Sequence, residues 1–262
     1  METMFIPGPG GYEIPLDLYG PAQAKMAVLI VHGFGSSRES SAAVRLAQAL
    51  AGQDMAACVP DLPGHGQSPA DGRSLTVENC LADLAAAEAC LRRRAPQARI
   101  AYFGSSFGAY LTSLYLARPG HRHSRAVLRC AALTMYRLLQ EDMEREPALG
   151  RSLREQGEVL LREFDRPLLL TQGLMDSLQA HDPFRLCRPH MARLLLIHGT
   201  ADEEAPVSQA REFARQMQAE LVEIENAGHR FQGPGQMEQV IETALAFLCP
   251  TGWERAVTAD EQ

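Results

Sequence analysis

The segment "GSSFG" (104–108) places Ser106 midway between two glycines, directly after an apolar run and before a segment with a helical pattern. A very tight turn from strand to helix holds such a serine in a strained backbone conformation and presents its hydroxyl above the sheet. Side chains two residues away on either side would collide with the strand and the helix, so both positions require glycine. The spacing predicts Ser106 as a nucleophile with Ser105 as its neighbour. A glycine-rich turn without chemistry is the alternative interpretation.

A serine hydroxyl is a weak nucleophile at neutral pH unless a base accepts its proton, and a histidine base needs a carboxylate to fix its tautomer. Asp202 follows one apolar run in "LLLIHGTADEEAP", and His229 follows the next in "VEIENAGHRF". If these runs are parallel strands, both residues lie at the carboxyl edge of the sheet together with Ser106. Glu203 and Glu204 crowd the same loop as Asp202 and are alternatives. Asp202 is favoured because a short side chain near the strand end suits a fixed orientation.

The chain has eight histidines, and their surroundings separate them. His32 and His198 lie within or at the ends of apolar runs, which favours structural roles. His121 and His123 lie in a polar, arginine-rich loop, and we expect them to face solvent. His229 follows a glycine on a short loop, so we expect it to point into a cleft and to act as the base.

Attack on a carbonyl also requires N–H donors for the oxyanion, and removing one donor commonly costs about 10² to 10³ in rate. The glycines of "VHGFGSS" (31–37) let the backbone approach a ligand closely. The backbone amides of Phe34 and of Phe107, the residue after the nucleophile, are therefore the candidate donors. A plain turn is the alternative, and the segment lacks the spacing of a phosphate-binding or dinucleotide-binding loop.

Apolar runs and helical patterns alternate along most of the chain, which predicts an α/β fold with a mainly parallel twisted sheet and helices on both faces. The expected strands cover 12–20, 25–33, 55–61, 99–104, 125–133, 192–199 and 219–225. The expected helices cover 40–53, 75–95, 106–118, 206–218 and 234–248.

Residues 134–190 interrupt this alternation with an amphipathic helical pattern followed by irregular sequence. Glycines and prolines divide the region into short pieces, which favours a small helical lid or cap over a single long crossover helix packed on the sheet. We therefore expect a core built from 1–133 and 191–262. Three apolar residues at the start of the insertion are candidates for substrate binding: Leu133, Met135 and Tyr136.

Composition narrows the class of protein. The 262 residues are 46% hydrophobic and 22% charged, which suits a globular core. A net charge of -7 without a basic cluster disfavours nucleic acid as a partner. No apolar run near the N-terminus has the length of a signal peptide or membrane span, so a cytoplasmic location is expected. The six cysteines lack CxxC spacing, and we expect buried free thiols.

Taken together, these motifs resemble the α/β-hydrolase family over essentially the whole chain. "HGFG" (32–35) looks like the family's oxyanion loop, "DLPGHGQS" (61–68) its loop after the next strand, and "GSSFG" its nucleophile turn. "HGTADEEAP" and "AGHR" look like the acid and histidine loops, in the family's chain order. The resemblance implies a triad of Ser106, Asp202 and His229, an oxyanion hole formed by the Phe34 and Phe107 amides, and a structural role for 61–68. Within the family, the small esterase and acyl-peptidase-like branch with a short lid is the most similar.

The expected reaction is hydrolysis of a carboxylic ester through an acyl-enzyme, without a metal or organic cofactor. Activity should rise with pH across about 5.5 to 7.5, where a histidine base loses its proton. Cleavage of a thioester or peptide by the same residues is the first alternative. A noncatalytic ligand-binding or protein-binding member of the fold is the second. The oligomeric state does not follow from the sequence.

Overall fold

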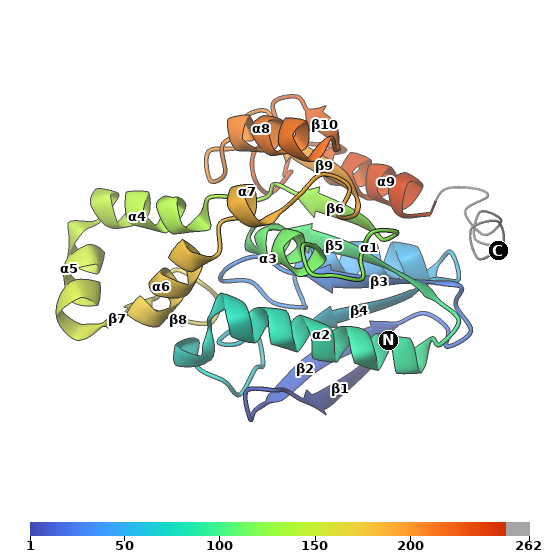
Figure 1. Cartoon of the computed structure of the whole chain (residues 1–262), viewed down its shortest axis with the longest axis horizontal. Coiled ribbons are helices and arrows are strands. Elements are labelled where there is room, and N and C mark those ends of the chain that lie inside the picture. The colour runs from blue at the N-terminus through green and yellow to red at the C-terminus, as the bar shows by residue number, and fades with distance from the viewer. Residues whose placement is uncertain (250–262) are drawn as a thin grey trace.

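The computed structural model describes residues 1–249. Within them, eight strands form one sheet in the order β1-β2-β4-β3-β5-β6-β9-β10 (Figure 1). The first two strands add antiparallel to the edge at β4, and all other neighbours pair in parallel, which confirms a mainly parallel sheet. The strands are β1 (Glu2–Pro7), β2 (Glu13–Tyr19), β3 (Met26–Val31), β4 (Ala56–Pro60), β5 (Arg99–Ser105), β6 (Arg125–Arg129), β9 (Arg193–Gly199) and β10 (Glu220–Ile224).

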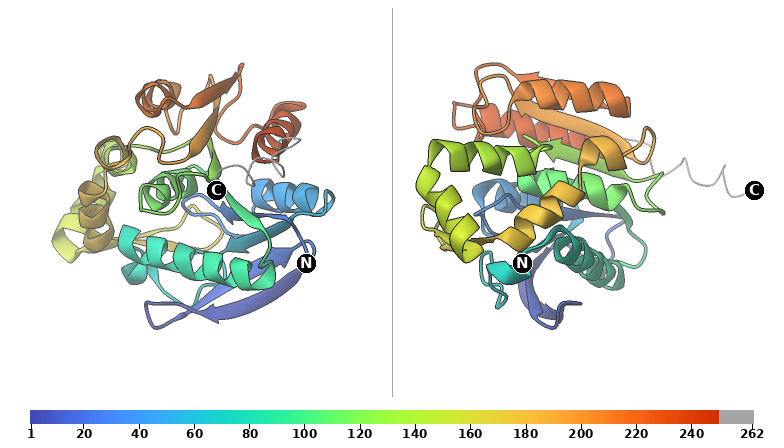
Figure 2. Two further views of the ribbon diagram at one scale, coloured as in Figure 1. Left: turned by 45° about the vertical axis from the view of Figure 1, so that its right-hand side comes forward. Right: turned by 60° about the vertical axis from the view of Figure 1, so that its left-hand side comes forward.

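Helices cover both faces of this sheet, as expected, and Figure 2 shows the two layers. One face packs against α1 (Ser41–Ala51) and α9 (Gln236–Leu248), and the other against α2 (Val77–Arg94), α3 (Phe107–Leu116) and α8 (Val207–Met217). Successive residues of β3 alternate between the two hydrophobic cores, Leu29 facing one and Ile30 the other. Burial on both faces explains why this strand reads as an unbroken apolar run.

The insertion between β6 and β9 differs from the continuous helical pattern expected for its first part. It contains α4 (Met135–Arg145), α5 (Pro147–Gln156), a hairpin of β7 (Glu158–Leu161) and β8 (Leu168–Thr171), α6 (Gln172–Ala180) and the short α7 (Pro183–Leu186). Gly157 ends α5 with a φ of 75°, a conformation that favours glycine, and the chain then enters the hairpin. Four-residue strands leave too little alternation to be separated from an amphipathic helix.

Strand β1 also lies outside the expected elements. It pairs in register with β2 from Glu2 opposite Leu18 to Pro7 opposite Glu13. A further short element, a 3₁₀ turn at Gly72–Ser74, precedes α2. Strand β1 extends the sheet at the edge that lies farthest from β9 and β10, where the acid and histidine loops begin.

Candidate active site

Ser106 lies at the turn between β5 and α3, in the conformation that the sequence pattern requires. Its φ of 56° and ψ of -117° are rare for a residue with a side chain. The turn is held from both sides: the Ser106 N–H donates to the Arg129 carbonyl at 2.8 Å, and its carbonyl accepts from the Ala109 N–H at 3.0 Å and the Tyr110 N–H at 3.1 Å. The strain is therefore fixed by the hydrogen bonds of the surrounding backbone.

The glycines around Ser106 are required by close backbone packing. A Cβ atom at Gly104 would lie 2.5 Å from the Gly108 carbonyl oxygen, and one at Gly108 would lie 2.2 Å from the carbonyl oxygen of Val31. A Cβ atom at Gly33 would lie 3.3 Å from that of Ser106. The end of β3, the end of β5 and the start of α3 thus meet at distances that exclude any side chain.

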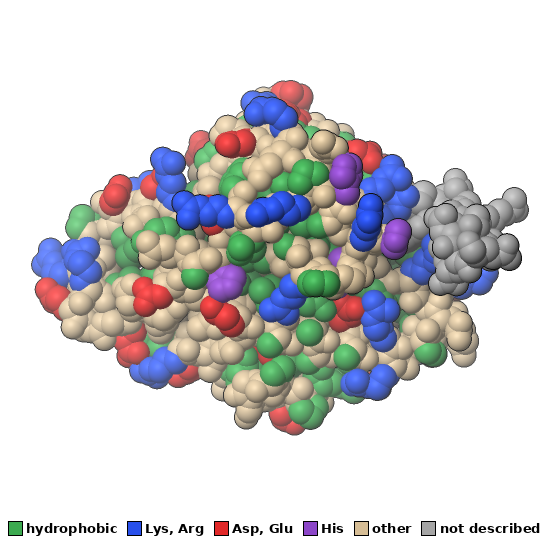
Figure 3. All heavy atoms as spheres, viewed as in Figure 1, with side chains coloured by type: hydrophobic (Ala, Val, Ile, Leu, Met, Phe, Trp, Pro, Cys, Tyr) green, Lys and Arg blue, Asp and Glu red, His purple; other side chains and the backbone are tan. Residues whose placement is uncertain are grey.

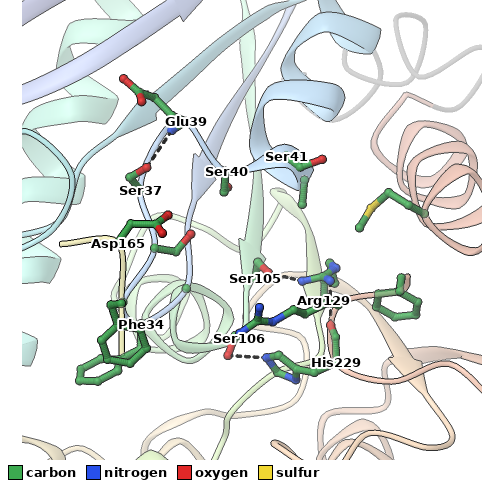
Figure 4. Close-up of a pocket in the computed structure, with 18 of the residues that line it drawn as sticks. Phe34, Ser37, Glu39, Ser40, Ser41, Ser105, Ser106, Arg129, Asp165 and His229 are labelled. Atoms are coloured by element: carbon green, nitrogen blue, oxygen red, sulfur yellow. Dashed lines mark hydrogen bonds between the residues drawn. The ribbon is translucent and has the colours of Figure 1, made fainter. Parts of the chain in front are cut away.

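The structure brings the three predicted chemical groups together, and Figure 4 shows the contact between Ser106 and His229. His229 Nε2 lies 2.9 Å from Ser106 Oγ, and His229 Nδ1 lies 2.8 Å from Asp202 Oδ2 and 3.0 Å from its Oδ1. The carboxylate requires a proton on Nδ1, so Nε2 is left to accept a proton from the serine hydroxyl. Asp202 follows β9 and His229 follows β10, so both come from the carboxyl edge of the sheet.

The surroundings of Asp202 in the acid loop, residues 200–206, keep its side chain in the carboxylate form. Burial by itself would raise its pKa, but hydrogen bonds from His198 and His229 hold the pKa far below the ordinary value. The Glu204 and Ala205 N–H groups also donate to Asp202 Oδ1, at 3.0 and 2.9 Å. The alternative Glu204 is largely exposed, and its carboxylate approaches His229 Nε2 only to 3.8 Å.

Cys130, His198 and Asp202 are a buried group whose potential ligand atoms lie within 4.8 Å of one another. Two of these groups already have partners: Asp202 accepts from His229, and His198 Nε2 donates to the Ala205 carbonyl at 2.7 Å, while His198 Nδ1 has no hydrogen-bond partner among the described residues. Burial also raises the pKa of the Cys130 thiol. We therefore treat these groups as packing behind Asp202 and assign no metal to them.

Two histidines fix the candidate oxyanion loop, residues 32–37. His32 Nδ1 donates to the Gly33 carbonyl at 2.8 Å, and its Nε2 accepts from the Leu62 N–H at 3.1 Å. His65 Nε2 accepts from the Gly35 N–H at 3.0 Å. Burial lowers the pKa of both, that of His65 to about 3, so both remain neutral acceptors. Segment 61–68, which follows β4, therefore holds the candidate oxyanion loop, which follows the neighbouring strand β3.

Phe34 and Phe107, whose amides are the candidate oxyanion donors, lie on the two sides of the site. Their rings meet edge to face with centroids 5.7 Å apart. Phe107 is fully buried as the first residue of α3, and Phe34 lines the cavity in front of Ser106. Among residues 1–249, no backbone acceptor takes the N–H group of Phe34 or of Phe107.

A cavity of about 1090 Å³ opens in front of Ser106 and His229. Its walls are the oxyanion loop, the start of α1, residues 64–67, the loop 163–166 of the insertion, and residues 229–238. Most of the lining side chains are polar, including Ser36, Ser40, Glu39 and Gln67, and few are apolar. The molecular face in Figure 3 carries both acidic and basic side chains.

The insertion reaches this cavity through its hairpin loop, residues 162–167, which the sequence did not indicate. Phe164 packs edge to face on Phe34 with centroids 5.8 Å apart, over Gly35. Arg166 donates to the carbonyls of loop 65–70, at 3.1 Å to His65, 3.0 Å to Gly66, 2.8 Å to Ser68 and 3.3 Å to Ala70. The hairpin loop is thus attached to the core beside the oxyanion loop.

The three residues expected to bind substrate lie elsewhere. Leu133 and Met135 are buried in the core at 1% and 6% exposure, and the Tyr136 hydroxyl accepts from Gln140 Nε2 at 3.1 Å on the surface of α4. None of the three is among the residues that line the described cavity. Their closeness to the end of β6 in sequence does not place them at the site, because the insertion returns to the cavity 28 residues beyond Tyr136, at Phe164.

A family model described as serine aminopeptidase, S33, matches residues 22–156, more than half of the chain. The chain belongs to this family of α/β hydrolases. Comparison with curated protein sequences gives no match. For this hydrolase, the six cysteines are free and five of them are buried, as expected. Within residues 1–249, no helix is both long and apolar enough to cross a membrane.

Solved structures share the hydrolase fold over nearly the full chain. A putative hydrolase from Agrobacterium vitis S4 is 22% identical, with a TM-score of 0.79 over 94% of this chain and 98% of its own. Est1E from Butyrivibrio proteoclasticus, bound to ferulic acid, is 20% identical, with a TM-score of 0.73 over 94% and 97%. The α/β hydrolase domain-containing protein 10 from mouse is 16% identical, with a TM-score of 0.71 over 93% and 96%. At these identities the likeness concerns the fold.

Proposed function

We propose that the protein is a serine hydrolase that cleaves a carboxylic ester through an acyl-enzyme. The observation that carries this proposal is the line of hydrogen bonds from Ser106 through His229 to Asp202, set on a strained turn. A structural serine gains nothing from a backbone conformation that is rare for its type, whereas a nucleophile gains exposure to both substrate and base.

In the proposed reaction, Ser106 Oγ attacks the acyl carbon while its proton passes to His229 Nε2. The carbonyl oxygen becomes an oxyanion, which accepts from the Phe34 and Phe107 N–H groups. The bond between the acyl carbon and the alcohol oxygen then breaks, and His229 returns its proton to the departing alkoxide. Water repeats the sequence on the acyl-enzyme and releases the carboxylic acid. Asp202 holds the imidazole in the required tautomer throughout.

The cavity and the comparisons support a polar, water-soluble ester rather than one with a long aliphatic acyl chain. The walls carry many hydroxyl and charged groups, and the apolar contribution near Ser106 comes mainly from Phe34 and Phe164. Est1E, whose fold is similar, has been solved with a carboxylic acid bound. We further propose that 134–190 acts as a cap whose hairpin loop forms one cavity wall.

The test is to incubate the purified protein with a fluorophosphonate probe and with nitrophenyl esters of increasing acyl length, beside Ser106→Ala. We expect a covalent adduct on Ser106, turnover that falls with long acyl chains, and loss of both in the variant. Ser208→Ala, the same change at an exposed position on α8, is the matched control and should leave labelling and turnover intact. Unchanged turnover in Ser106→Ala would refute the nucleophile assignment.

The second candidate reaction is hydrolysis of a thioester or amide by the same residues. The matching family is named for serine aminopeptidases, which favours including amides. Comparison of an ester, a thioester and an anilide with the same acyl group separates these reactions. An intact triad without turnover of any of them would instead favour a binding role.

A further inference from the structure

Arg129, the last residue of β6, lines the cavity beside Ser106 and His229, and its two hydrogen-bond acceptors are neutral. Its NH1 donates to Ser105 Oγ at 2.5 Å, its NH2 donates to the His229 carbonyl at 2.7 Å, and its guanidinium carbon lies 4.8 Å from the centre of the Phe231 ring. The residue is 5% exposed, and its Nε has no hydrogen-bond partner among the described residues. A buried cation held in this way costs folding free energy, so its presence calls for a role.

The two hydrogen bonds of the guanidinium join the two halves of the candidate site. Ser105 belongs to the nucleophile turn, and the His229 carbonyl belongs to the histidine loop, residues 225–235. The main chain of Arg129 adds a third link, because its carbonyl accepts from the Ser106 N–H at 2.8 Å. One residue therefore contacts the backbone of both partners in the 2.9 Å contact between Ser106 Oγ and His229 Nε2.

The other links of the histidine loop run to the acid loop. The Ala201 N–H donates to the Ala227 carbonyl at 3.0 Å, and the Asn226 N–H donates to Thr200 Oγ1 at 2.9 Å. These contacts place the loop relative to β9, which β6 separates from β5, so they set its distance from the nucleophile turn only through the sheet. Arg129 supplies that restraint from the side of β6.

We propose that Arg129 is a positioning residue that sets the distance between Ser106 and His229. The inference rests on the proposed function, because a fixed distance matters only if a proton passes between these groups. Misplacement of reacting groups by about 1 Å can cost about 10² in rate. Loss of the guanidinium should therefore lower kcat while substrate binding is kept.

Arg125 provides a matched control on the same strand. It is 9% exposed, its NH1 donates to the Phe247 carbonyl at 3.0 Å, and its guanidinium carbon lies 5.2 Å from the centre of the Phe247 ring. These contacts resemble those of Arg129, but they lie at the other end of β6, away from Ser106. Arg125→Met should therefore disturb packing without disturbing the site.

The first experiment compares Arg129→Met with Arg125→Met in melting temperature, kcat and KM on the best nitrophenyl ester. We expect similar melting temperatures for the two variants, a kcat about 10² lower for Arg129→Met with KM changed less than about threefold, and near-native kinetics for Arg125→Met. Equal kcat values in two folded variants, or a loss confined to KM, would overturn the proposal.

The variant Arg129→Lys separates the charge of the guanidinium from its two hydrogen bonds. The lysine keeps the positive charge, but a single ammonium group cannot donate to both Ser105 and the His229 carbonyl as a planar guanidinium does. We therefore expect kcat to recover only in part. Full recovery of kcat would overturn the proposed restraint by two contacts. If Arg129→Met does not fold, this variant carries the kinetic comparison.

Proton NMR of the His229 Nδ1–H, which faces Asp202, reports the geometry of the imidazole directly. We expect the chemical shift of this far-downfield signal to change in Arg129→Met and to keep its native value in Arg125→Met. An unchanged signal in both variants would overturn the proposal. If the native protein is neither labelled nor active, the proposed function fails, and the NMR comparison still decides the positioning role.

Discussion

The carboxyl group of Asp83 should make the protein less stable as the pH rises from about 4 to 6. Asp83 lies on α2 with 2% exposure and accepts a hydrogen bond from the Tyr12 hydroxyl at 2.9 Å, while its Oδ1 has no partner among the described residues. Burial raises its pKa from 3.8 to about 6. The folded protein therefore binds this proton more tightly than the unfolded chain does.

The sign follows from proton linkage. Between pH 3.8 and about 6 the folded state holds more protons at Asp83, so the free energy of unfolding falls as the pH rises through this window and is constant above it. Each pH unit in the window is worth about 1.4 kcal/mol, so the loss between about pH 4.5 and 7.5 is about 2 kcal/mol. The buried His32 and His65 act oppositely, because their lowered pKa values reduce stability as the pH falls below the ordinary histidine range.

The perturbation that isolates Asp83 is Asp83→Asn, which cannot ionise and still accepts from Tyr12. Urea unfolding of both proteins at about pH 4.5 and 7.5 gives the free-energy difference at each pH, and the other titrating groups cancel. We expect this difference to change by about 2 kcal/mol in favour of the variant at the higher pH. Asp176→Asn, at an exposed site on α6, is the control for replacing a carboxyl group by an amide.

A pH-independent difference between native protein and Asp83→Asn would refute this reasoning, and so would a change in favour of the native protein at high pH. Tyr12→Phe provides a second test, because it should increase the loss of stability with rising pH. The Tyr12 hydrogen bond lowers the pKa of Asp83, so its removal should raise that pKa further and widen the window of stability loss.

Three further predictions concern the candidate site. Gly108→Ala places a Cβ atom 2.2 Å from the Val31 carbonyl oxygen and should lower the free energy of unfolding by about 3 kcal/mol or more, measured by urea titration; a native-like value would contradict the packing argument. His65→Phe removes the acceptor for the Gly35 N–H, and kcat/KM should fall about tenfold or more in a protein that still folds by circular dichroism. Asp202→Asn should lower kcat by about 10⁴ with little change in melting temperature, and a loss below tenfold would exclude Asp202 as the orienting acid.

The parts of the site that could be predicted from the sequence are those whose residue types are determined by the chemistry or by close packing of the nearby backbone. Gly104, Ser106 and Gly108 are informative because a side chain at either glycine would overlap neighbouring backbone. Asp202 and His229 follow strand ends, and parallel strands bring such ends to one edge of the sheet. The core elements were predicted within a few residues for the same reason, since strands buried on both faces give unbroken apolar runs.

The features that were missed depend on contacts between distant segments. Phe164 reaches the cavity only because β7 and β8 form a hairpin, and four-residue strands give a weak pattern. Arg129 gave no signal because its partners, Ser105 and His229, are set by tertiary packing. His121, expected in solvent, instead packs its ring against Tyr115 with centroids 5.0 Å apart.

The attachment of the hairpin loop bears on how such hydrolases can be recombined. Arg166 uses four backbone carbonyls that belong to the core, and Phe164 occupies the space left by a glycine of the oxyanion loop. Backbone carbonyls persist through almost any side-chain replacement, whereas the glycine does not. An insertion grafted from another hydrolase would therefore need an arginine and a ring at these two points, and a core that accepts the present insertion would need glycine at position 35. The insertion and the core of this chain are exchangeable as a pair rather than as independent modules.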